Sequence, residues 1–437
     1  MYREIFKKLE EWKEEKNKKP LIIEGARQVG KTWIMKEFGK KIYKNDVIYI
    51  NFDKNKEFDN LFNNNLEPQK IIDKLNIILN KTITEQTLIL FDEIQECPRA
   101  LTSLKYFSEE TNYQIICAGS FLGIALHKGT SFPVGKVQFL NLYPMNFNEF
   151  LIANGEEKIV KAIELQDFDL IKIFKKDLEE YLKLYFYIGG MPAVVQNYIE
   201  NKDLQKVKEI QETILESYEN DFSKHTEKNV FPRMLDLWHS IPSQLAKENK
   251  KFLYKNIKEG ARAREYEIAM LWLSDCRLIS KVENITKATL PLTSYINSSS
   301  FKLFFVDIGL LSVMLSLNYS TIFNGNDILQ EYKGALTEQF VLQELKCLNS
   351  KSNREILINY WSKERGMAEV DFVIQKNNYI IPIEVKATIN LKAKSLKTYN
   401  EAFKPEIMIR TSMADYKKTD NLFDIPLYIV KNFVEKI

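Results

Sequence analysis

The chain has 437 residues, 45% of them hydrophobic, which is enough to build the cores of about three globular domains. Its 62 basic and 59 acidic residues give a net charge of +3, which is too small a field to indicate a polyanionic partner. The four cysteines, at 97, 117, 276 and 347, are too far apart to indicate a zinc site or a disulfide framework. No apolar signal segment begins the chain, and the longest apolar run is shorter than the roughly 20 residues of a membrane span. We therefore expect a cytoplasmic protein with no membrane partner.

Short apolar runs alternate with helical stretches in the first third of the chain. The runs predicted as strands are LIIEG (21–25), VIYINF (47–52), TLILFDE (87–93), QIICAGS (114–120) and KVQFLNL (136–142). Continuous apolar strands of this kind are typical of a parallel sheet that helices cover on both faces. The sequence therefore predicts an α/β domain here.

A glycine-rich loop follows the first of these strands. Its residues match the pattern G-x-x-x-x-G-K-[ST]: Gly25, Ala26, Arg27, Gln28, Val29, Gly30, Lys31 and Thr32. Because a helical segment comes next, backbone N–H groups of the loop can surround a phosphate at a helix N-terminus. Lys31 is expected to reach the β- and γ-phosphates of ATP, and Thr32 to hold Mg²⁺. A plain glycine turn is the alternative, and the complete pattern in this context argues against it.

A pair of acidic residues follows the third strand. Asp92 is expected to bind Mg²⁺ through water, and Glu93 to orient or deprotonate the attacking water. Acidic residues at a helix start are the alternative. Ser120, at the end of the fourth strand, is predicted either to contact the γ-phosphate or water, or to cap a helix. The extra strand at 47–52 indicates that the strands before the loop and before Asp92 are not neighbours in the sheet.

The segment 20–150 resembles the AAA-related ATPases called archaeal-type ATPases. The motifs that carry the resemblance are GARQVGKT, LILFDEIQE, CAGSFLGIAL and LYPMNFNEF, and YIGGMPAVV further on resembles a break common in the lids of these ATPases. The resemblance implies ATP hydrolysis, with Lys31, Thr32, Asp92 and Glu93 as the matching residues.

The middle of the chain is expected to hold two further domains. Long charged helical segments predict a helical lid at 146–225, after a domain at 1–145 that comprises an N-terminal helix and the P-loop ATPase. From 226 to 329, two helices and two strands follow in the order of a winged helix-turn-helix. Within it, 246–264 has seven basic and two acidic residues, a surplus typical of a DNA phosphate contact. A solvated lysine-rich face and a protein-docking module are the alternatives.

The stretch VDFVIQKNNYIIPIEVKA is predicted to form a β-hairpin with charges on its strands. By the period of two, Asp371 points away from its apolar neighbours, and Glu384 and Lys386 share a face. Two carboxylates can hold Mg²⁺, and a lysine beside them can hold the scissile phosphate or the attacking water. This is the D…E-x-K arrangement of restriction-endonuclease-like folds. Glu338, on the apolar face of the preceding helix, is predicted as a third metal ligand beside Asp371 and Glu384.

A structural reading of the same residues is a strand pair with outward charges and a glutamate at a helix rim. The motifs GALTEQFVLQEL, EVDFVI and IPIEVKA resemble the domain of unknown function that commonly follows archaeal-type ATPase modules and is similar to the restriction-endonuclease-like superfamily. This resemblance implies nuclease chemistry in residues 330–437. Pro382 predicts that the second hairpin strand lies at an edge or carries a bulge.

The complete expectation is an α/β protein with a P-loop NTPase parallel sheet, a helical lid, a winged helix and an endonuclease-like α/β domain. It would be an ATP-hydrolysing, Mg²⁺-dependent enzyme that moves the last two domains on DNA. The alternative is an ATP-dependent switch that binds protein partners and retains an inactive nuclease-like scaffold. The expected ligands are ATP and Mg²⁺, and the expected partners are DNA, a protein partner and further copies of the chain.

Overall fold

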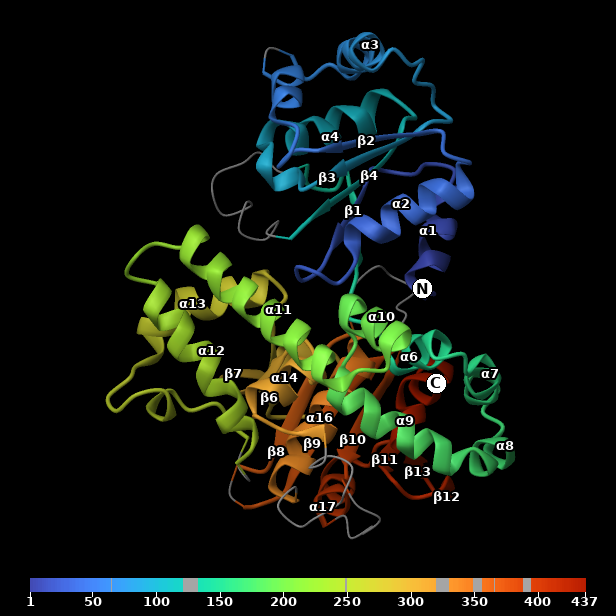
Figure 1. The fold of residues 1–437 in the computed structure, drawn as a ribbon. Coiled ribbons are helices and arrows are strands. Elements are labelled where there is room, and N and C mark those ends of the chain that lie inside the picture. The colour runs from blue at the N-terminus through green and yellow to red at the C-terminus, as the bar shows by residue number, and fades with distance from the viewer. Residues whose placement is uncertain are drawn as a thin grey trace. The chain divides into compact units, whose positions relative to one another are not determined.

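The computed structural model describes all of the chain except residues 64, 121–132, 248–249, 320–329, 349–355, 365 and 388–393, and the side chains of 225 and 330–333. It divides into two compact units, whose course Figure 1 shows. The first, here called the N-terminal unit, comprises Tyr2–Tyr143 and Asp275–Leu278. The second, the C-terminal unit, comprises Met1, Pro144–Ser274 and Ile279–Ile437.

The N-terminal unit contains a five-stranded parallel sheet. Its strands are β1 (Leu21–Glu24), β2 (Val47–Asn51), β3 (Leu88–Asp92), β4 (Gln114–Gly119) and β5 (Gln138–Asn141). Their order in the sheet is β2-β3-β4-β1-β5. The five predicted strands are confirmed, and β4 separates β1 from β3 as the extra strand indicated (Figure 1). The phosphate-binding loop follows β1, and Asp92 is the last residue of β3. One strand, β4, lies between these two strands.

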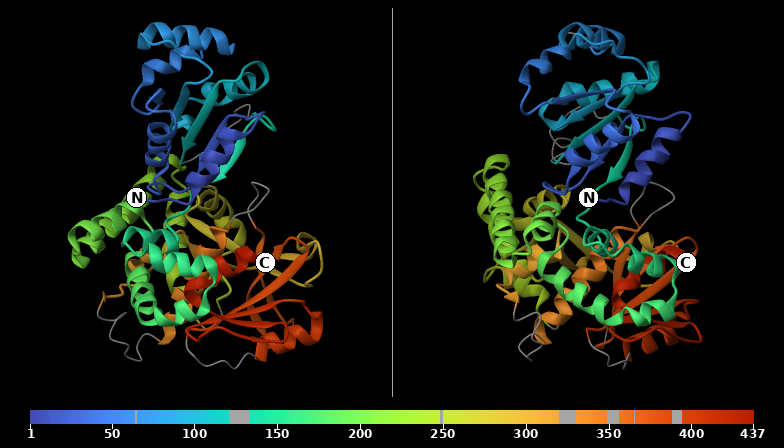
Figure 2. Two further views of the ribbon diagram at one scale, coloured as in Figure 1. Left: turned by 90° about the vertical axis from the view of Figure 1, so that its right-hand side faces the viewer. Right: turned by 45° about the vertical axis from the view of Figure 1, so that its right-hand side comes forward.

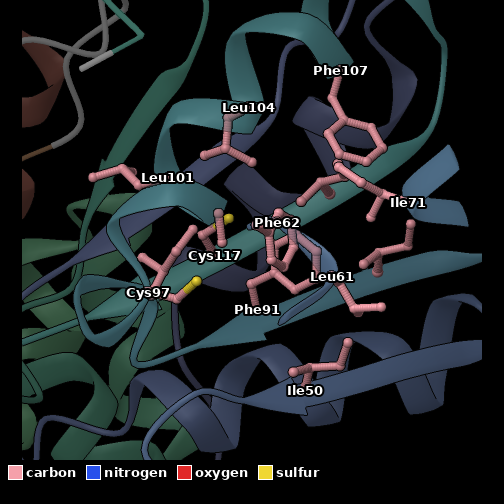
Figure 3. Close-up of a cluster of buried hydrophobic side chains, with 14 of the residues drawn as sticks. Ile50, Leu61, Phe62, Ile71, Phe91, Cys97, Leu101, Leu104, Phe107 and Cys117 are labelled. Carbon is pink, nitrogen blue, oxygen red and sulfur yellow. The ribbon is translucent and has the colours of Figure 1, made fainter. Parts of the chain in front are cut away.

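Helices cover this sheet because its central strands are largely apolar; β3 and β4 are buried at every residue. The helices of the unit are α1 (Ile5–Glu14), α2 (Lys31–Ile42), η1 (Lys56–Leu61), α3 (Pro68–Leu79), η2 (Ile94–Glu96) and α4 (Pro98–Glu110). One core cluster joins α3 and α4 to β2, β3 and β4, and Figure 3 shows part of it. At its centre Phe62 and Phe91 meet edge to face, with ring centroids 6.1 Å apart. Burying each such side chain contributes about 1.5–3 kcal/mol, which fixes β3 and the acids that follow it.

The C-terminal unit contains an eight-stranded mixed sheet with the order β12-β13-β11-β10-β9-β8-β6-β7. Its strands are β6 (Ile279–Ile285), β7 (Ile296–Phe305), β8 (Ile358–Ser362), β9 (Glu369–Lys376), β10 (Tyr379–Val385), β11 (Met408–Ser412), β12 (Lys417–Thr419) and β13 (Leu422–Pro426). The predicted hairpin is the antiparallel pair β9 and β10. It lies near the middle of the sheet, with β8 on one side and β11 on the other.

The helices of the C-terminal unit are α6 (Phe147–Ala153), α7 (Glu157–Leu165), α8 (Phe168–Ile173), α9 (Lys175–Ile188), α10 (Pro192–Asn201), α11 (Leu204–His225), α12 (Phe231–Leu245), η3 (Tyr254–Asn256), α13 (Ala263–Asp275), η4 (Leu292–Tyr295), α14 (Ile308–Met314), α16 (Gln330–Lys346), α17 (Lys394–Phe403), η6 (Leu427–Ile429) and α18 (Val430–Lys436). Figure 2 shows them around the sheet; α9 and α11 contact α14, and α14 contacts α16, which in turn contacts β10. None of the helices in the described part of the chain is both long enough and apolar enough to cross a membrane.

The two strands expected to form the wing of a winged helix are part of this larger sheet. β6 and β7 are antiparallel, as expected of a wing, but β6 also pairs in parallel with β8. The side chains of Ile279, Val282 and Ile285 in β6 are buried. They can therefore pack with apolar side chains of a neighbouring strand on either side. Residues 144–274 and 279–437 belong to one compact unit, and the expected boundary after residue 145 lies two residues from the observed division. The finer division into 146–225, 226–329 and 330–437 stays a prediction.

The structure corrects the prediction made from Pro382. Its strand, β10, is central and lies between β9 and β11. Pro382 pairs with Val373 of β9, and the ladder with β11 begins one residue later, at Ile383. A proline is tolerated at the point where a ladder starts, because its missing N–H has no strand partner to lose there.

Candidate functional site

The phosphate-binding loop lies between β1 and α2, in the strand, loop and helix order that the pattern predicted. A Cβ atom on Gly25 would lie 2.3 Å from the carbonyl oxygen of Leu142, so this position admits only glycine. Gly30 has φ 97° and ψ 23°, a left-handed conformation that favours glycine, and α2 begins at the next residue. Of the side chains between them, the outer two, Ala26 and Val29, are buried, and the inner two, Arg27 and Gln28, are exposed.

Lys31 is buried beneath this loop. Its Nζ donates hydrogen bonds of 2.8 Å to the carbonyl oxygens of Gly25 and of Ala26. Burial lowers the pKa of Lys31 to about 8, although the charges of Asp92 and Glu93 partly oppose this. Asp92 and Glu93 act on Lys31 through their charges, but within the described residues neither forms an ion pair with it, so a phosphate would give this ammonium group an anion in direct contact.

Asp92 is the acceptor at the centre of the site, with 2% of its surface exposed. Its Oδ2 accepts from the hydroxyl of Thr32 at 2.8 Å, the hydroxyl of Tyr49 at 2.7 Å and the amide of Asn51 at 3.4 Å. Its Oδ1 accepts from the backbone N–H of Glu93 at 3.2 Å. All four donors are neutral, and no lysine or arginine of the described chain forms an ion pair with this carboxylate. The Thr32 hydroxyl beside an uncompensated carboxylate fits the ligands that Mg²⁺ prefers.

Glu93 is held in a conformation that non-glycine residues rarely adopt. Its φ is 51° and its ψ is 46°, in the left-handed region. Its Oε2 accepts a hydrogen bond of 2.7 Å from the side-chain amide of Gln95. Backbone strain of this kind is common at functional sites, where neighbouring contacts maintain it. Here the contact from Gln95 fixes the carboxylate next to Asp92.

Ser120 is buried and follows the last residue of β4. The segment 121–126 of its motif, CAGSFLGIAL, lies outside the described residues. Both predictions for Ser120, a γ-phosphate contact and a helix cap, therefore stay predictions.

Four residues of the N-terminal unit belong to the neighbourhood of this site but were not predicted. Tyr49 and Asn51 had a readable signal, because the period of two in VIYIN places them on one face of β2, whose register sets Asn51 beside Asp92. Gln95 had only its closeness in sequence to Glu93. Arg277, from the short segment 275–278, donates to Glu24 Oε2 at 3.0 Å and to Asn141 Oδ1 at 3.2 Å, and no local pattern indicates it.

A second group of charged side chains lies in the C-terminal unit, and it contains the predicted nuclease-like residues. Glu338 lies on α16, Asp371 on β9 and Glu384 on β10, and all three are buried or half-buried. Asp371 Oδ2 accepts 2.7 Å from the backbone N–H of Val385, and Lys386 Nζ lies 2.5 Å from Glu384 Oε1. The predicted acids and lysine are thus close together, as the alternation of the hairpin indicated.

A lysine in the middle of these acids was not predicted. Lys302, on β7, has a fully buried side chain, and its Nζ lies 2.6 Å from Glu369 Oε1, 3.5 Å from Glu338 Oε2 and 4.0 Å from Asp371 Oδ1. Lys250 contacts the other oxygen of Glu338. A lone lysine within the apolar run SFKLFFVD was the available signal, since a lysine is almost never buried without a partner.

The charges of this second group are balanced by the protein itself. Burial opposes ionisation of Glu338, but Lys250 and Lys302 outweigh it and hold its pKa at about 2. Burial, together with the charges of Glu338 and Glu384, raises the pKa of Asp371 well above its usual range. Among the described residues, no three or more histidine, cysteine, aspartate or glutamate side chains are arranged to hold a metal ion. The predicted Mg²⁺ site at Glu338, Asp371 and Glu384 does not fit this geometry.

The basic stretch 246–264 divides between the interior and the surface. Lys250 is mostly buried against Glu338. Arg262 and Arg264, at the start of α13, are exposed. Residues 248 and 249 lie outside the described part of the chain. The surface of this stretch therefore keeps part of the predicted basic surplus.

Comparisons with known proteins agree with the division of the chain. Residues 17–151 match the AAA domain family, 179–321 match the domain of unknown function DUF8612, and 333–430 match the domain of unknown function DUF4143. An uncharacterized protein of Methanocaldococcus jannaschii is 25% identical over 392 residues, which are 88% of this chain and 78% of that protein. The AAA match supports the prediction of a P-loop ATPase domain that the motifs gave.

Two solved structures are similar over 72% of this chain. The Walker-type ATPase PABY2304 of Pyrococcus abyssi is 15% identical, with 95% of its chain covered and a TM-score of 0.43. The Orc1 protein of Aeropyrum pernix, solved in complex with DNA, is 11% identical, with 93% of its chain covered and a TM-score of 0.28. TM-scores below 0.5 do not support a shared function. The function proposed below rests on the AAA match and on the geometry of the phosphate-binding site.

Proposed function

We propose that the chain is a Mg²⁺-dependent ATP hydrolase whose active site lies at the carboxyl ends of β1 and β3. One observation carries the proposal: buried Asp92 accepts a hydrogen bond from Thr32 of the phosphate-binding loop, and its donors among the described residues are all neutral. An uncompensated carboxylate beside the hydroxyl of a phosphate loop is costly without a cation, and Mg²⁺ with ATP would supply one. The AAA domain match at 17–151 supports the same assignment.

Each residue of the site has a role that its contacts favour. Thr32 and Asp92 would hold Mg²⁺, which on binding neutralises charge on the β- and γ-phosphates. Lys31 would exchange its two loop carbonyl partners for phosphate oxygens, which are stronger acceptors. Glu93 would accept the proton of the attacking water on its carboxylate, and Gln95 would keep that carboxylate in place.

The test is phosphate release by the full chain carrying Glu93→Gln. The amide cannot accept the proton, so kcat should fall by about 10²- to 10⁴-fold while ATP binding is retained. Glu96→Gln, three residues away in a surface ion pair with Lys56, is the matched control and should leave the rate unchanged. A wild-type chain without Mg²⁺-dependent phosphate release, with or without DNA, would count against the proposal. So would a Glu93→Gln chain as active as the control.

DNA binding by the basic stretch 246–264 is a second proposal, and the exposure of Arg262 and Arg264 favours it. Phosphate contacts release counterions, so the affinity for duplex DNA should fall steeply with salt. Arg262→Glu combined with Arg264→Glu should weaken binding in fluorescence anisotropy. Unchanged binding by this double variant would remove the stretch as a DNA contact and favour a protein partner instead.

The contacts around the hairpin bear on the choice between nuclease and scaffold. Nuclease chemistry at Asp371, Glu384 and Lys386 stays a prediction from the sequence. The contacts of Lys302 and Lys250 with the acids favour the alternative, an ATP-dependent switch with an inactive nuclease-like scaffold. Such a switch would act through protein partners or further copies of the chain, and a nucleotide-dependent change in assembly would reveal it.

A further inference from the structure

We infer that Lys302 is the resident cation of the acidic cluster on α16, β9 and β10, and that the cluster is an internal ion-paired junction that takes no divalent metal. This inference concerns the C-terminal unit alone and does not depend on the ATPase proposal. It also accounts for acids on strands that are otherwise apolar: they neutralise a buried lysine.

The geometry places the Lys302 ammonium group among three carboxylates. Its Nζ is within 4.0 Å of Glu338, Glu369 and Asp371, which come from two different elements. The ring of Tyr360 lies beneath the same ammonium group, 5.1 Å from it, and adds a cation–π contact. A metal ion that bound Glu338, Glu369 and Asp371 through these oxygens would compete with the ammonium group for them.

The lysine has no alternative place to go. Its side chain is 0% exposed, so leaving the acids would strand an unpaired ammonium group in the core, which is strongly unfavourable. Its charge stays on because the neighbouring acids raise the pKa of Lys302 above its usual range, although burial opposes them. A divalent ion would therefore have to displace one buried charge and leave another uncompensated.

The two sides of the junction come from different matched families. Lys302 and Lys250 belong to the segment 179–321, and the acids belong to the segment 333–430. The pairing therefore ties β7 and the turn after α12 to α16 and β9. It joins segments that are 88 residues apart for Lys250 and 36 for Lys302, counted to Glu338. The first segment thus supplies two lysines that pair with acids of the second segment.

One oxygen atom of the cluster favours metal binding. Glu384 Oε2 is buried and has no hydrogen-bond partner within the described structure, although Lys386 pairs with its other oxygen. An oxygen of this kind is what a metal would use. The experiment must therefore ask directly whether the cluster responds to a divalent ion while Lys302 is present.

The experiment is thermal unfolding of the full chain, with Asp92→Asn present throughout to remove the proposed metal ligand of the ATP site. Melting temperatures are recorded in EDTA and in about 1 mM Mn²⁺, because an ion that binds the folded state raises them. We expect no Mn²⁺ shift while Lys302 is present. Lys302→Met should lower the melting temperature by roughly 10 °C, since it leaves the acids buried without their cation.

Lys281→Met is the matched control, because Lys281 is an exposed lysine on the neighbouring strand β6 with its own ion pair to Glu283. Its melting temperature should stay near that of the parent. Mn²⁺ should raise the melting temperature of Lys302→Met but not of Lys281→Met, because only the first opens a place for an ion. If Lys302→Met does not fold, Glu369→Gln removes one partner of the lysine and should give a smaller loss, still without a Mn²⁺ shift.

Two results would overturn the inference. The first is a Mn²⁺ shift in the parent chain that Asp371→Asn abolishes, because the cluster would then bind a metal beside Lys302. The second is equal stability and equal Mn²⁺ response of Lys302→Met and Lys281→Met, because Lys302 would then hold neither the acids nor the place of an ion.

Discussion

The protein has two sites built from the same kinds of residue, and they differ in how their charges are compensated. At the phosphate-binding loop, as far as the described residues go, Asp92 accepts from neutral donors and Lys31 donates to backbone carbonyls. In the acidic cluster, Lys302, Lys250 and Lys386 are each in contact with a carboxylate. At the first site the charges are available to pair with a ligand. In the acidic cluster they pair with one another.

This difference teaches that acids and lysines near one another do not by themselves indicate catalysis. A buried ion pair satisfies its own desolvation cost and has no need of a ligand. A buried charge with neutral partners keeps part of that cost until an opposite charge arrives. The partners of each charge therefore separate a binding site from a structural junction better than the residue types do.

The largest effect is expected at the loop lysine. Lys31→Ala should lower kcat/KM for ATP by at least about 100-fold, because it removes the donor to the phosphates. Lys40→Ala, an exposed lysine on the same helix, is the control and should leave phosphate release unchanged. Equal rates for the two variants would contradict the distinction between the two sites. Lys31 would then be a structural lysine, like Lys302, and would not bind ATP.

Asp307, a buried acid of the C-terminal unit, tests the same distinction. Like Asp92 and unlike Glu338, it accepts hydrogen bonds from neutral groups. Asp307 caps α14 and accepts from the backbone N–H groups of Leu310 at 3.1 Å and Gly190 at 2.7 Å, with the amide of Gln343 at 3.3 Å. Burial raises its pKa from 3.8 to about 6. The folded state then holds the proton more tightly than the unfolded state. The contribution to stability is therefore present at low pH and is lost as the pH rises toward 6.

Urea unfolding of wild type and Asp307→Asn checks this sign. The advantage of the wild type should shrink by about 3 kcal/mol as the pH is raised across this window. Asp203→Asn, at the exposed N-cap of α11, controls for the loss of a capping carboxylate. An advantage that grows with pH would mean that Asp307 is compensated by a positive charge, as Glu338 is.

A smaller effect is expected at Tyr49. Burial, with the nearby Asp92, raises the pKa of Tyr49 to about 12, so its hydroxyl stays protonated and donates to Asp92. Tyr49→Phe should raise the Mg²⁺ concentration for half-maximal ATP hydrolysis by about tenfold, because the carboxylate loses a group that orients it. Tyr43→Phe removes the hydroxyl that donates to Gln114 in the same unit and is the control. An equal effect of both variants would indicate a loss of packing only.

The smallest effect is expected for an ion pair at the surface. Lys136 Nζ lies 2.9 Å from Glu109, and both side chains are more than a third exposed. Lys136→Ala should leave the free energy of unfolding nearly unchanged, because water screens such a pair. Urea unfolding measures this, and a loss as large as that of Lys302→Met would contradict the distinction between exposed and buried pairs.

Much of the N-terminal unit could be predicted from the sequence because its signals are local. Five apolar runs gave five strands, and one eight-residue pattern gave the loop from Gly25 to Thr32. The acids after β3 followed from their place at a strand end. In the hairpin, the period of two correctly brought Asp371, Glu384 and Lys386 together.

The sequence could not give the pairing of distant segments. The wing strand β6 also pairs with β8, more than 70 residues later, so the expected winged helix lies inside a larger sheet. Lys302 and Lys250 precede Glu338 by 36 and 88 residues. Contacts of this range depend on tertiary packing and leave no spacing to read, which is why the acids alone suggested a metal site.

The most direct test of the account is the number of Mn²⁺ ions bound per chain, measured by electron paramagnetic resonance with a non-hydrolysable ATP analogue present. We expect one ion for the wild type and none for Asp92→Asn. The carboxylate of Asp92 is available to a cation, whereas the acids of the cluster are paired with lysines. Two ions in the wild type, with one retained in Asp92→Asn, would contradict the account, since the acidic cluster would then bind a metal despite Lys302.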